Sequence, residues 1–214
     1  MKTNKEFIYQ VDNHDYQVII TYKNIKNIHY RFDGEKFLIS AHRLTPMKLI
    51  KNGLDKYALK LIKRSVKIKA ERDNYIYIFG NKIMLSHPGE INFSDGSVIS
   101  YKDNDDLNKK LKKWFLNVLK RRTEYYAKLM HAPAYLVKLR KMKSRYGSNN
   151  RNTKTITYSL TLIHYSLEII DSVVVHELTH CFVYDHSDNF YRLLYKYCPN
   201  YDTLRKKLIH AEFK

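Results

Sequence analysis

The sequence predicts an α+β fold with two lobes. An N-terminal antiparallel β-rich lobe is expected over residues 1–104 and a helical lobe over residues 105–214. Apolar and polar residues alternate in the first third of the chain, whereas apolar residues recur at helical spacing from Asp106. Only six Gly and four Pro occur among 214 residues, and no stretch resembles a flexible linker. The two lobes are therefore expected to form one compact unit.

The N-terminal lobe should consist of antiparallel strands interrupted by one helix. Thr45 suits the N-cap of that helix, Pro46 suits its first position, and Ser65 lies near its expected end. Turn residues that favour hairpins divide three of the strand segments. The strand segments are residues 7–13, 16–23, 27–42, 74–87 and 91–102, with turns at Asp33-Gly34, Gly80-Asn81 and Asp95-Gly96.

The C-terminal lobe should begin with a long helix whose apolar residues lie on one face. Residues 134–163 follow and predict two strands around a polar turn. Ser166 then suits the N-cap of a helix that continues through Phe182, and two shorter helices should follow it. The apolar face of the long helix comprises Leu107, Leu111, Phe115, Val118, Tyr125 and Leu129; Ser187 and Asp202 are the expected caps of the shorter helices, the first of which should stop at Pro199.

The chain is strongly basic, with a net charge of +18 and a pI of about 9.7. The stretch from Lys109 to Arg145 contains thirteen Lys or Arg residues and only one acidic residue, Glu124. This basic stretch is either a solvated helix face or a surface that binds nucleic acid. The many lysines could also result from an A/T-rich genome without selection for binding. Lys, Asn, Ile, Tyr and Phe all have A/T-rich codons, and all are abundant in this chain.

No apolar run reaches the roughly 18 to 20 residues that span a membrane, and the N-terminus lacks the apolar core of a signal peptide. We therefore expect a cytoplasmic protein with no membrane partner. Cys181 and Cys198 have neither zinc-knuckle nor redox spacing, which suits two buried thiols in a reducing compartment.

The segment His-Glu-Leu-Thr-His, residues 176–180, carries the clearest chemistry. Residues four apart share one face of a helix, so His176 and His180 can converge on one metal ion. Glu177 is placed to deprotonate a bound water, and His186 is the candidate third ligand. A single zinc ion is the expected cofactor. The alternative is an amphipathic helix whose histidines are buried in the core and satisfied there.

Several segments are similar to one known family, the YgjP-like metallopeptidases, which are predicted bacterial zinc hydrolases related to SprT-like proteins and other zincins. Residues 142–150 resemble the family segment M-K-[ST]-R-W-G-S-C, residues 169–180 its I-D-Y-V-V-x-H-E-L-x-H helix, and residues 185–201 its N-H-S-x-x-F-W segment with the following P-x-Y. The chain departs from the family at Tyr146, Asn149, Ser159 and Tyr191, where Trp, Cys, Asn and Trp are usual.

The resemblance implies a zincin-like metallopeptidase domain in which His176, His180 and His186 bind zinc and Glu177 is the general base. Hydrolysis of a peptide by zinc-activated water is the first hypothesis. Stabilising the oxyanion then requires a cationic or hydroxyl donor, for which Lys143, Arg145 and Tyr146 are candidates.

Three other functions remain open on the sequence. Zinc-activated water also hydrolyses phosphoanhydrides, so a basic protein could act on an anionic small molecule such as a nucleotide pyrophosphate. A SprT-like protease associated with nucleic acid is another hypothesis. The non-enzyme alternative is a nucleic-acid-binding module with structural zinc, although three histidines would leave one zinc position open, whereas structural sites are normally closed by four ligands.

Overall fold

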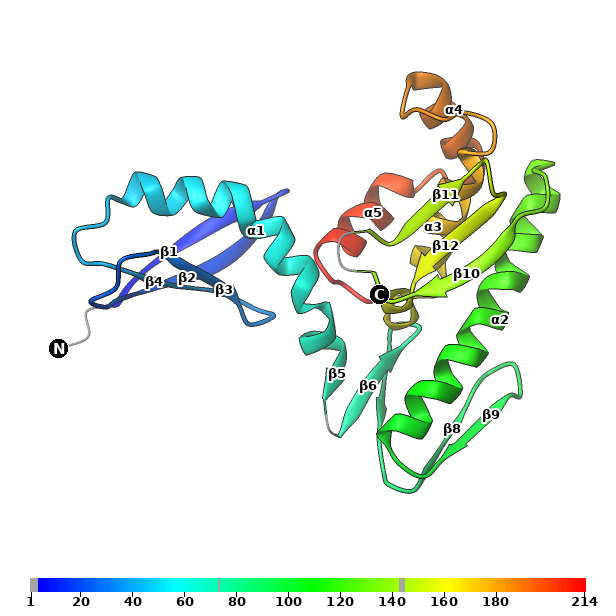
Figure 1. Ribbon diagram of the computed structural model, residues 1–214, viewed down its shortest axis with the longest axis horizontal. Coiled ribbons are helices and arrows are strands. Elements are labelled where there is room, and N and C mark those ends of the chain that lie inside the picture. Colours follow the sequence, from blue (N-terminus) through cyan, green and yellow to red (C-terminus); the bar gives the residue numbers. More distant parts are fainter. Residues whose placement is uncertain (1–3, 73, 143–144) are drawn as a thin grey trace. The chain divides into compact units, whose positions relative to one another are not determined.

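The computed structural model describes residues 4–72, 74–142 and 145–214, and it confirms the α+β class. The chain divides into two compact units (Figure 1). The N-terminal unit comprises residues 1–69 and 209–211, and the C-terminal unit comprises residues 70–208 and 212–214. None of the helices in the described ranges combines the length and apolar character needed to cross a membrane.

The N-terminal unit is a four-stranded sheet with one helix, α1, in the strand order β1-β2-β4-β3. The β1–β2 hairpin turns at Asp12 and Asn13, both with positive φ, and the β3–β4 hairpin turns at the predicted Asp33-Gly34. The elements are β1 (Asn4–Val11), β2 (His14–Tyr22), β3 (His29–Phe32), β4 (Phe37–Ala41) and α1 (Met47–Ala70).

The prediction that these strands are all antiparallel is wrong for one pair, because β2 and β4 run parallel. The second hairpin places β4, and not β3, beside β2. Strand β4 is the more apolar of the two, since Phe37, Ile39 and Ala41 are buried, whereas His29 and Arg31 of β3 are exposed. The polar strand therefore lies at the sheet edge, where solvent reaches its side chains.

Helix α1 covers one face of this sheet. It begins at Met47, one residue after the expected start, and continues beyond Ser65 to Ala70. Between residues 47 and 65 its buried apolar residues recur every four positions and form one apolar stripe along the helix. These residues are Ile50, Leu54, Ala58 and Ile62, and they belong to the same core as Val18, Ile20, Phe37 and Ile39 of the sheet.

The C-terminal unit begins with two small sheets, which the sequence analysis assigned to the N-terminal lobe. The strands are β5 (Glu71–Arg72), β6 (Tyr75–Ile78), β7 (Asn81–Met84), β8 (Gly89–Asn92) and β9 (Val98–Tyr101). The unit boundary differs from the predicted residue 104, because β9 contacts the long helix that follows it. The β8–β9 turn includes the predicted Asp95-Gly96, whereas the β6–β7 turn is Phe79-Gly80, one residue earlier than predicted.

Helix α2 (Asn104–Met130) has Asp103 as its N-cap, whose side chain accepts a hydrogen bond from the N–H of Asp106. The predicted apolar face is buried only as far as Val118, since Tyr125 and Leu129 are 57% and 49% exposed. The helix changes its packing partners along its length. Near its start, Lys110 donates a hydrogen bond to the carbonyl of Ser100 in β9. Further along, the hydroxyl of Thr123 shares a hydrogen bond with that of Tyr158, which lies in strand β12 (Thr155–Ser159).

An ion pair links α2 to the helix that carries the candidate metal ligands. Arg122 donates from Nε to Asp171 Oδ1 at 2.7 Å and from a second nitrogen to Oδ2, and Tyr126 donates to Oδ2 at 3.2 Å. Asp171→Ala should lower the free energy of unfolding by about 2 kcal/mol, because a half-buried guanidinium loses its charged partner. Urea denaturation measures this change. Glu168→Ala on the same helix, at an exposed position, should cost much less, and equal losses would contradict the prediction.

The central sheet of the C-terminal unit has three strands in the order β10-β12-β11, where the sequence predicted two. Strands β10 and β12 are parallel, and β11 is antiparallel to β12. Ser166 and Ser187 occupy the N-cap positions as predicted, although neither side chain makes a capping hydrogen bond, and Asp202 lies inside its helix. The elements are β10 (Leu136–Arg140), β11 (Gly147–Asn150), β12 (Thr155–Ser159), the 3-10 helix η1 (Leu160–His164), α3 (Leu167–Thr179), α4 (Asp188–Tyr197) and α5 (Tyr201–Ile209).

Candidate metal centre

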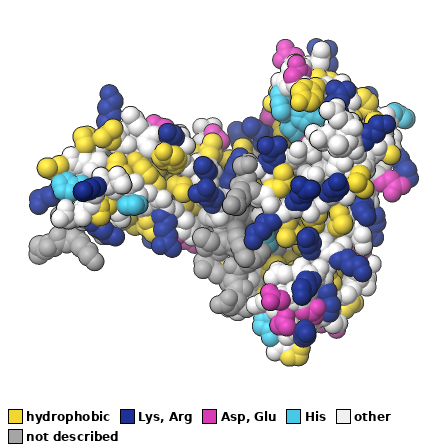
Figure 2. Space-filling view, viewed as in Figure 1, with side chains coloured by type: hydrophobic (Ala, Val, Ile, Leu, Met, Phe, Trp, Pro, Cys, Tyr) yellow, Lys and Arg dark blue, Asp and Glu magenta, His cyan; other side chains and the backbone are white. Residues whose placement is uncertain are grey.

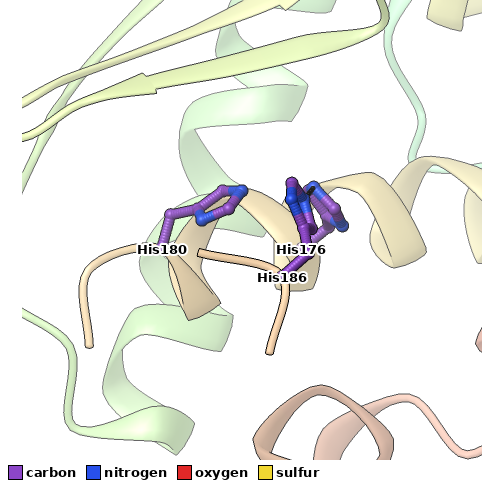
Figure 3. A group of neighbouring side chains, drawn as sticks. All are labelled: His176, His180 and His186. Carbon is purple, nitrogen blue, oxygen red and sulfur yellow. Dashed lines mark hydrogen bonds between the residues drawn. The ribbon is translucent and has the colours of Figure 1, made fainter. Parts of the chain in front are cut away.

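Helix α3 places two of the three candidate ligands. It is buried along most of its length, and the α-helix ends at Thr179. His180 follows as the C-cap with φ −64° and ψ −12°, so its backbone stays helical and the four-residue spacing from His176 is kept. His186 lies in the segment between α3 and α4. The three imidazole rings are turned toward one another (Figure 3).

The geometry of these histidines fits a divalent ion. One possible ligand atom from each of His176, His180 and His186 lies within 4.8 Å of the other two. The Nε2 atoms of His176 and His186 are 3.3 Å apart. Zinc–nitrogen bonds of about 2.0 to 2.1 Å in a tetrahedral site place ligand atoms about 3.3 Å apart. Small adjustments of the His180 ring would therefore complete a three-nitrogen site.

Hydrogen bonds orient two of the rings with Nε2 toward the group. His180 Nδ1 lies 3.2 Å from the carbonyl of Val183, which can only accept, so Nδ1 carries the proton and Nε2 has a free lone pair. His176 Nδ1 lies 2.9 Å from the hydroxyl of Tyr201. In the tautomer that leaves Nε2 free, His176 donates to this hydroxyl. A second group that fixes each ring is typical of metal-binding histidines.

Tyr201 was not recognised as a functional residue from the sequence. Only its place in the segment similar to P-x-Y pointed to it. Tyr201→Phe removes the acceptor for His176 Nδ1–H, and we expect the dissociation constant for zinc to rise by about 10-fold. Competition with a chromophoric chelator measures the constant. Tyr184→Phe, at a hydroxyl on a side chain that is 75% exposed, is the control and should leave the constant unchanged. Equal constants for both variants would contradict an orienting role for Tyr201.

Burial keeps two of the candidate ligands, His176 and His180, neutral. Burial is the main reason that the pKa of His176 is lowered to about 3, and positive charge on His180 or His186 would lower it further. Burial likewise lowers the pKa of His180. Neutral imidazole is the form that binds a metal ion, so no proton has to be displaced from either ring near neutral pH.

Glu177 follows His176 directly in α3 but does not belong to this group, since the set of nearby ligand atoms in the described residues comprises the three histidines. Its side chain is buried, with 5% exposure, and burial raises the pKa of its carboxyl to about 8. The positive charge of Arg145 acts in the opposite direction. A buried carboxyl that follows His176 directly along the chain suits a site that receives a cation.

The three candidates for oxyanion stabilisation have different surroundings. Arg145 is exposed, precedes β11 by two residues and influences Glu177 electrostatically. Tyr146 donates its hydroxyl to the carbonyl of Leu208 at 3.0 Å and lies 3.1 Å from the hydroxyl of Tyr165, so it is engaged in packing against α5. Lys143 lies outside the described residues. Among the three, Arg145 is the residue whose positive charge acts on Glu177, and its role at an oxyanion stays a prediction.

The basic stretch from Lys109 to Arg145 is divided between α2, β10 and the segments beside them. Several of its cations have acidic partners, and on the visible face of the C-terminal unit Lys and Arg are spread among other side chains (Figure 2). The nucleic-acid partner stays a prediction. The pairs are Lys110–Asp106, Arg121–Asp95, Arg122–Asp171 and Lys128–Glu124.

Two of the comparisons with known proteins found similar proteins. The family model described as YgjP-like, metallopeptidase domain matches residues 26–211. Two crystal structures of metallopeptidase zymogens are similar over 42% of this chain: abylysin of Pyrococcus abyssi, with 19% identity, a TM-score of 0.41 and 91% of its own chain covered, and jannalysin of Methanocaldococcus jannaschii, with 20% identity, a TM-score of 0.40 and 93% covered. The search of curated proteins gave no match.

Proposed function

Because the chain belongs to the family of YgjP-like metallopeptidase domains, we propose that it is a zinc-dependent peptidase with Glu177 as its general base. His176, His180 and His186 would hold the zinc. The observation that carries this proposal is the convergence of three imidazoles near the C-terminal end of α3, where Glu177, the residue after His176, has a buried carboxyl. Three nitrogen ligands with one position left for water or substrate are typical of catalytic zinc.

In the proposed reaction, Glu177 would transfer the proton and Arg145 would stabilise the developing negative charge. Bound zinc supplies a Lewis acid that polarises the scissile carbonyl and lowers the pKa of water toward about 7. Glu177 would accept a proton from the attacking water and pass it to the leaving amine. Arg145 is our candidate for stabilising the oxyanion.

Strand β11 favours a peptide as the substrate. It lies at an edge of the sheet formed by β10, β12 and β11. The carbonyl of Tyr146 accepts a hydrogen bond from the N–H of Ser159 at 2.8 Å. In an antiparallel pair of strands, hydrogen-bonded and non-hydrogen-bonded residue pairs alternate. The backbone N–H and C=O groups of Gly147 and Asn149 therefore point away from β12. An extended peptide can pair with such an edge, and this edge lies beside Glu177.

A turnover assay with matched substrates tests the function. Zinc-loaded protein is incubated with a panel of unstructured peptides and, separately, with nucleoside triphosphates and dinucleotide pyrophosphates. We expect new peptide termini and no release of nucleoside monophosphates or pyrophosphate. A metal chelator should abolish the cleavage, and added zinc should restore it. Release of nucleoside monophosphates or pyrophosphate without peptide cleavage would favour the pyrophosphohydrolase, and metal binding without any turnover would favour the structural-zinc module.

A further inference from the structure

Strand β11 makes two contacts with Glu177 that the proposed chemistry does not include. The first is at Gly147, whose backbone lies directly against the Glu177 side chain. A Cβ atom on Gly147 would lie 2.3 Å from Glu177 Oε1 and 2.7 Å from both Cγ and Cδ. Contacts this short require one of the two groups to move. The Glu177 carboxyl therefore occupies space that any other residue at position 147 would fill.

The backbone conformation does not explain this glycine. Gly34, Gly80 and Gly96 have the positive φ values that favour glycine, but Gly147 does not. Inside a strand, glycine is less stable than alanine by roughly 0.5 to 1 kcal/mol, because it loses more conformational freedom on folding. Glycine at position 147 is explained by the neighbouring carboxyl, for which it leaves room.

The second contact is at Asn149. Its Nδ2 donates to the backbone carbonyl of Glu177 at 2.7 Å. In a continuing α-helix that carbonyl would accept from the N–H of Cys181, but Cys181 N–H bonds to the carbonyl of Leu178 at 2.9 Å instead. Asn149 thus replaces the hydrogen bond that Glu177 loses where α3 ends. Side chains alternate along a strand, so Gly147 and Asn149 share the face toward α3.

We propose that β11 positions the Glu177 carboxyl: Gly147 leaves the space for it, and Asn149 fixes the backbone of the same residue. In this role both are positioning residues, because the missing side chain of Gly147 and the amide of Asn149 act through Glu177, separately from the backbone groups at the strand edge. The inference rests on the proposed function, in which Glu177 is the general base. A displacement of about 1 Å at a reacting group can cost about 100-fold in rate, so the effect should be large.

Gly147→Ala tests the first contact. We expect kcat to fall by about 100-fold, while KM and zinc content change by less than about threefold, because the ligands are untouched. Ser148→Ala on the opposite face of β11 is the matched control and should keep wild-type kcat. Asn149→Asp tests the second contact by placing an acceptor opposite the Glu177 carbonyl, and kcat should fall by about tenfold.

A double variant separates positioning from damage to the fold. If Gly147 acts through the carboxyl, Gly147→Ala should have no further effect on kcat in a Glu177→Gln protein. A further fall in residual rate, or loss of zinc from Gly147→Ala, would overturn the inference. So would wild-type kcat in Gly147→Ala when Glu177→Gln is inactive. Full activity of Glu177→Gln alone would instead refute the proposed function.

Discussion

Replacing Glu177 by Gln is expected to leave zinc bound while peptide hydrolysis falls by at least about 100-fold. Glutamine keeps the shape of the side chain and part of its hydrogen bonding, but it cannot accept a proton from water. The three histidines that would bind the metal are unchanged, and Glu177 is not part of their group. Metal content by mass spectrometry and kcat on one cleaved peptide, measured on the same protein preparation, give both quantities.

Glu168→Gln is the matched control for this prediction. It makes the same chemical change in the same helix, but Glu168 is exposed in the first turn of α3. Its kcat should stay within about twofold of wild type, because surface substitutions have small effects. Loss of zinc from Glu177→Gln would show that the carboxylate is a ligand. Retention of both zinc and full activity would leave the structural-zinc module as the better explanation.

The sequence predicted the features of the fold that depend on local signals. The turns at Asp33-Gly34 and Asp95-Gly96, the caps at Ser166 and Ser187 and the long helix α2 follow from residue type and period over a few positions. The parallel pairing of β2 with β4 depends instead on which strand of a hairpin is more apolar. Strand β11 has the sequence Gly-Ser-Asn-Asn and no apolar alternation, so its pairing with β12 comes only from the tertiary structure.

In the candidate site, too, some features follow from local sequence signals and others depend on contacts between distant parts of the chain. His176, His180 and Glu177 were predicted because helix geometry brings residues four apart together. The supporting contacts come from distant parts of the chain: Tyr201 lies 25 residues from His176 along the sequence, and Asn149 lies 28 residues from Glu177. No period or spacing relates positions so far apart. Gly147 carried no local turn signal, and only the contact with the Glu177 side chain explains it.

Removing a single candidate ligand should weaken zinc binding sharply. His176→Ala, His180→Ala and His186→Ala should each raise the dissociation constant by at least about 100-fold, since zinc binding worth about 10 to 16 kcal/mol is shared among few ligands. Chelator competition measures the three constants. His29→Ala, at an exposed histidine of the N-terminal unit, should keep wild-type affinity.

His186 provides the sharpest version of this test. It is the exposed member of the group and lies outside α3, so its replacement is expected to disturb the core least. His176 and His180 are held by Tyr201 and by the carbonyl of Val183, so their rings should stay in place when His186 is removed. The loss of affinity in His186→Ala should therefore reflect the missing nitrogen alone. The test is made at a free zinc concentration that only just saturates the wild-type protein. Full zinc occupancy in His186→Ala at that concentration would show that another residue supplies the third ligand.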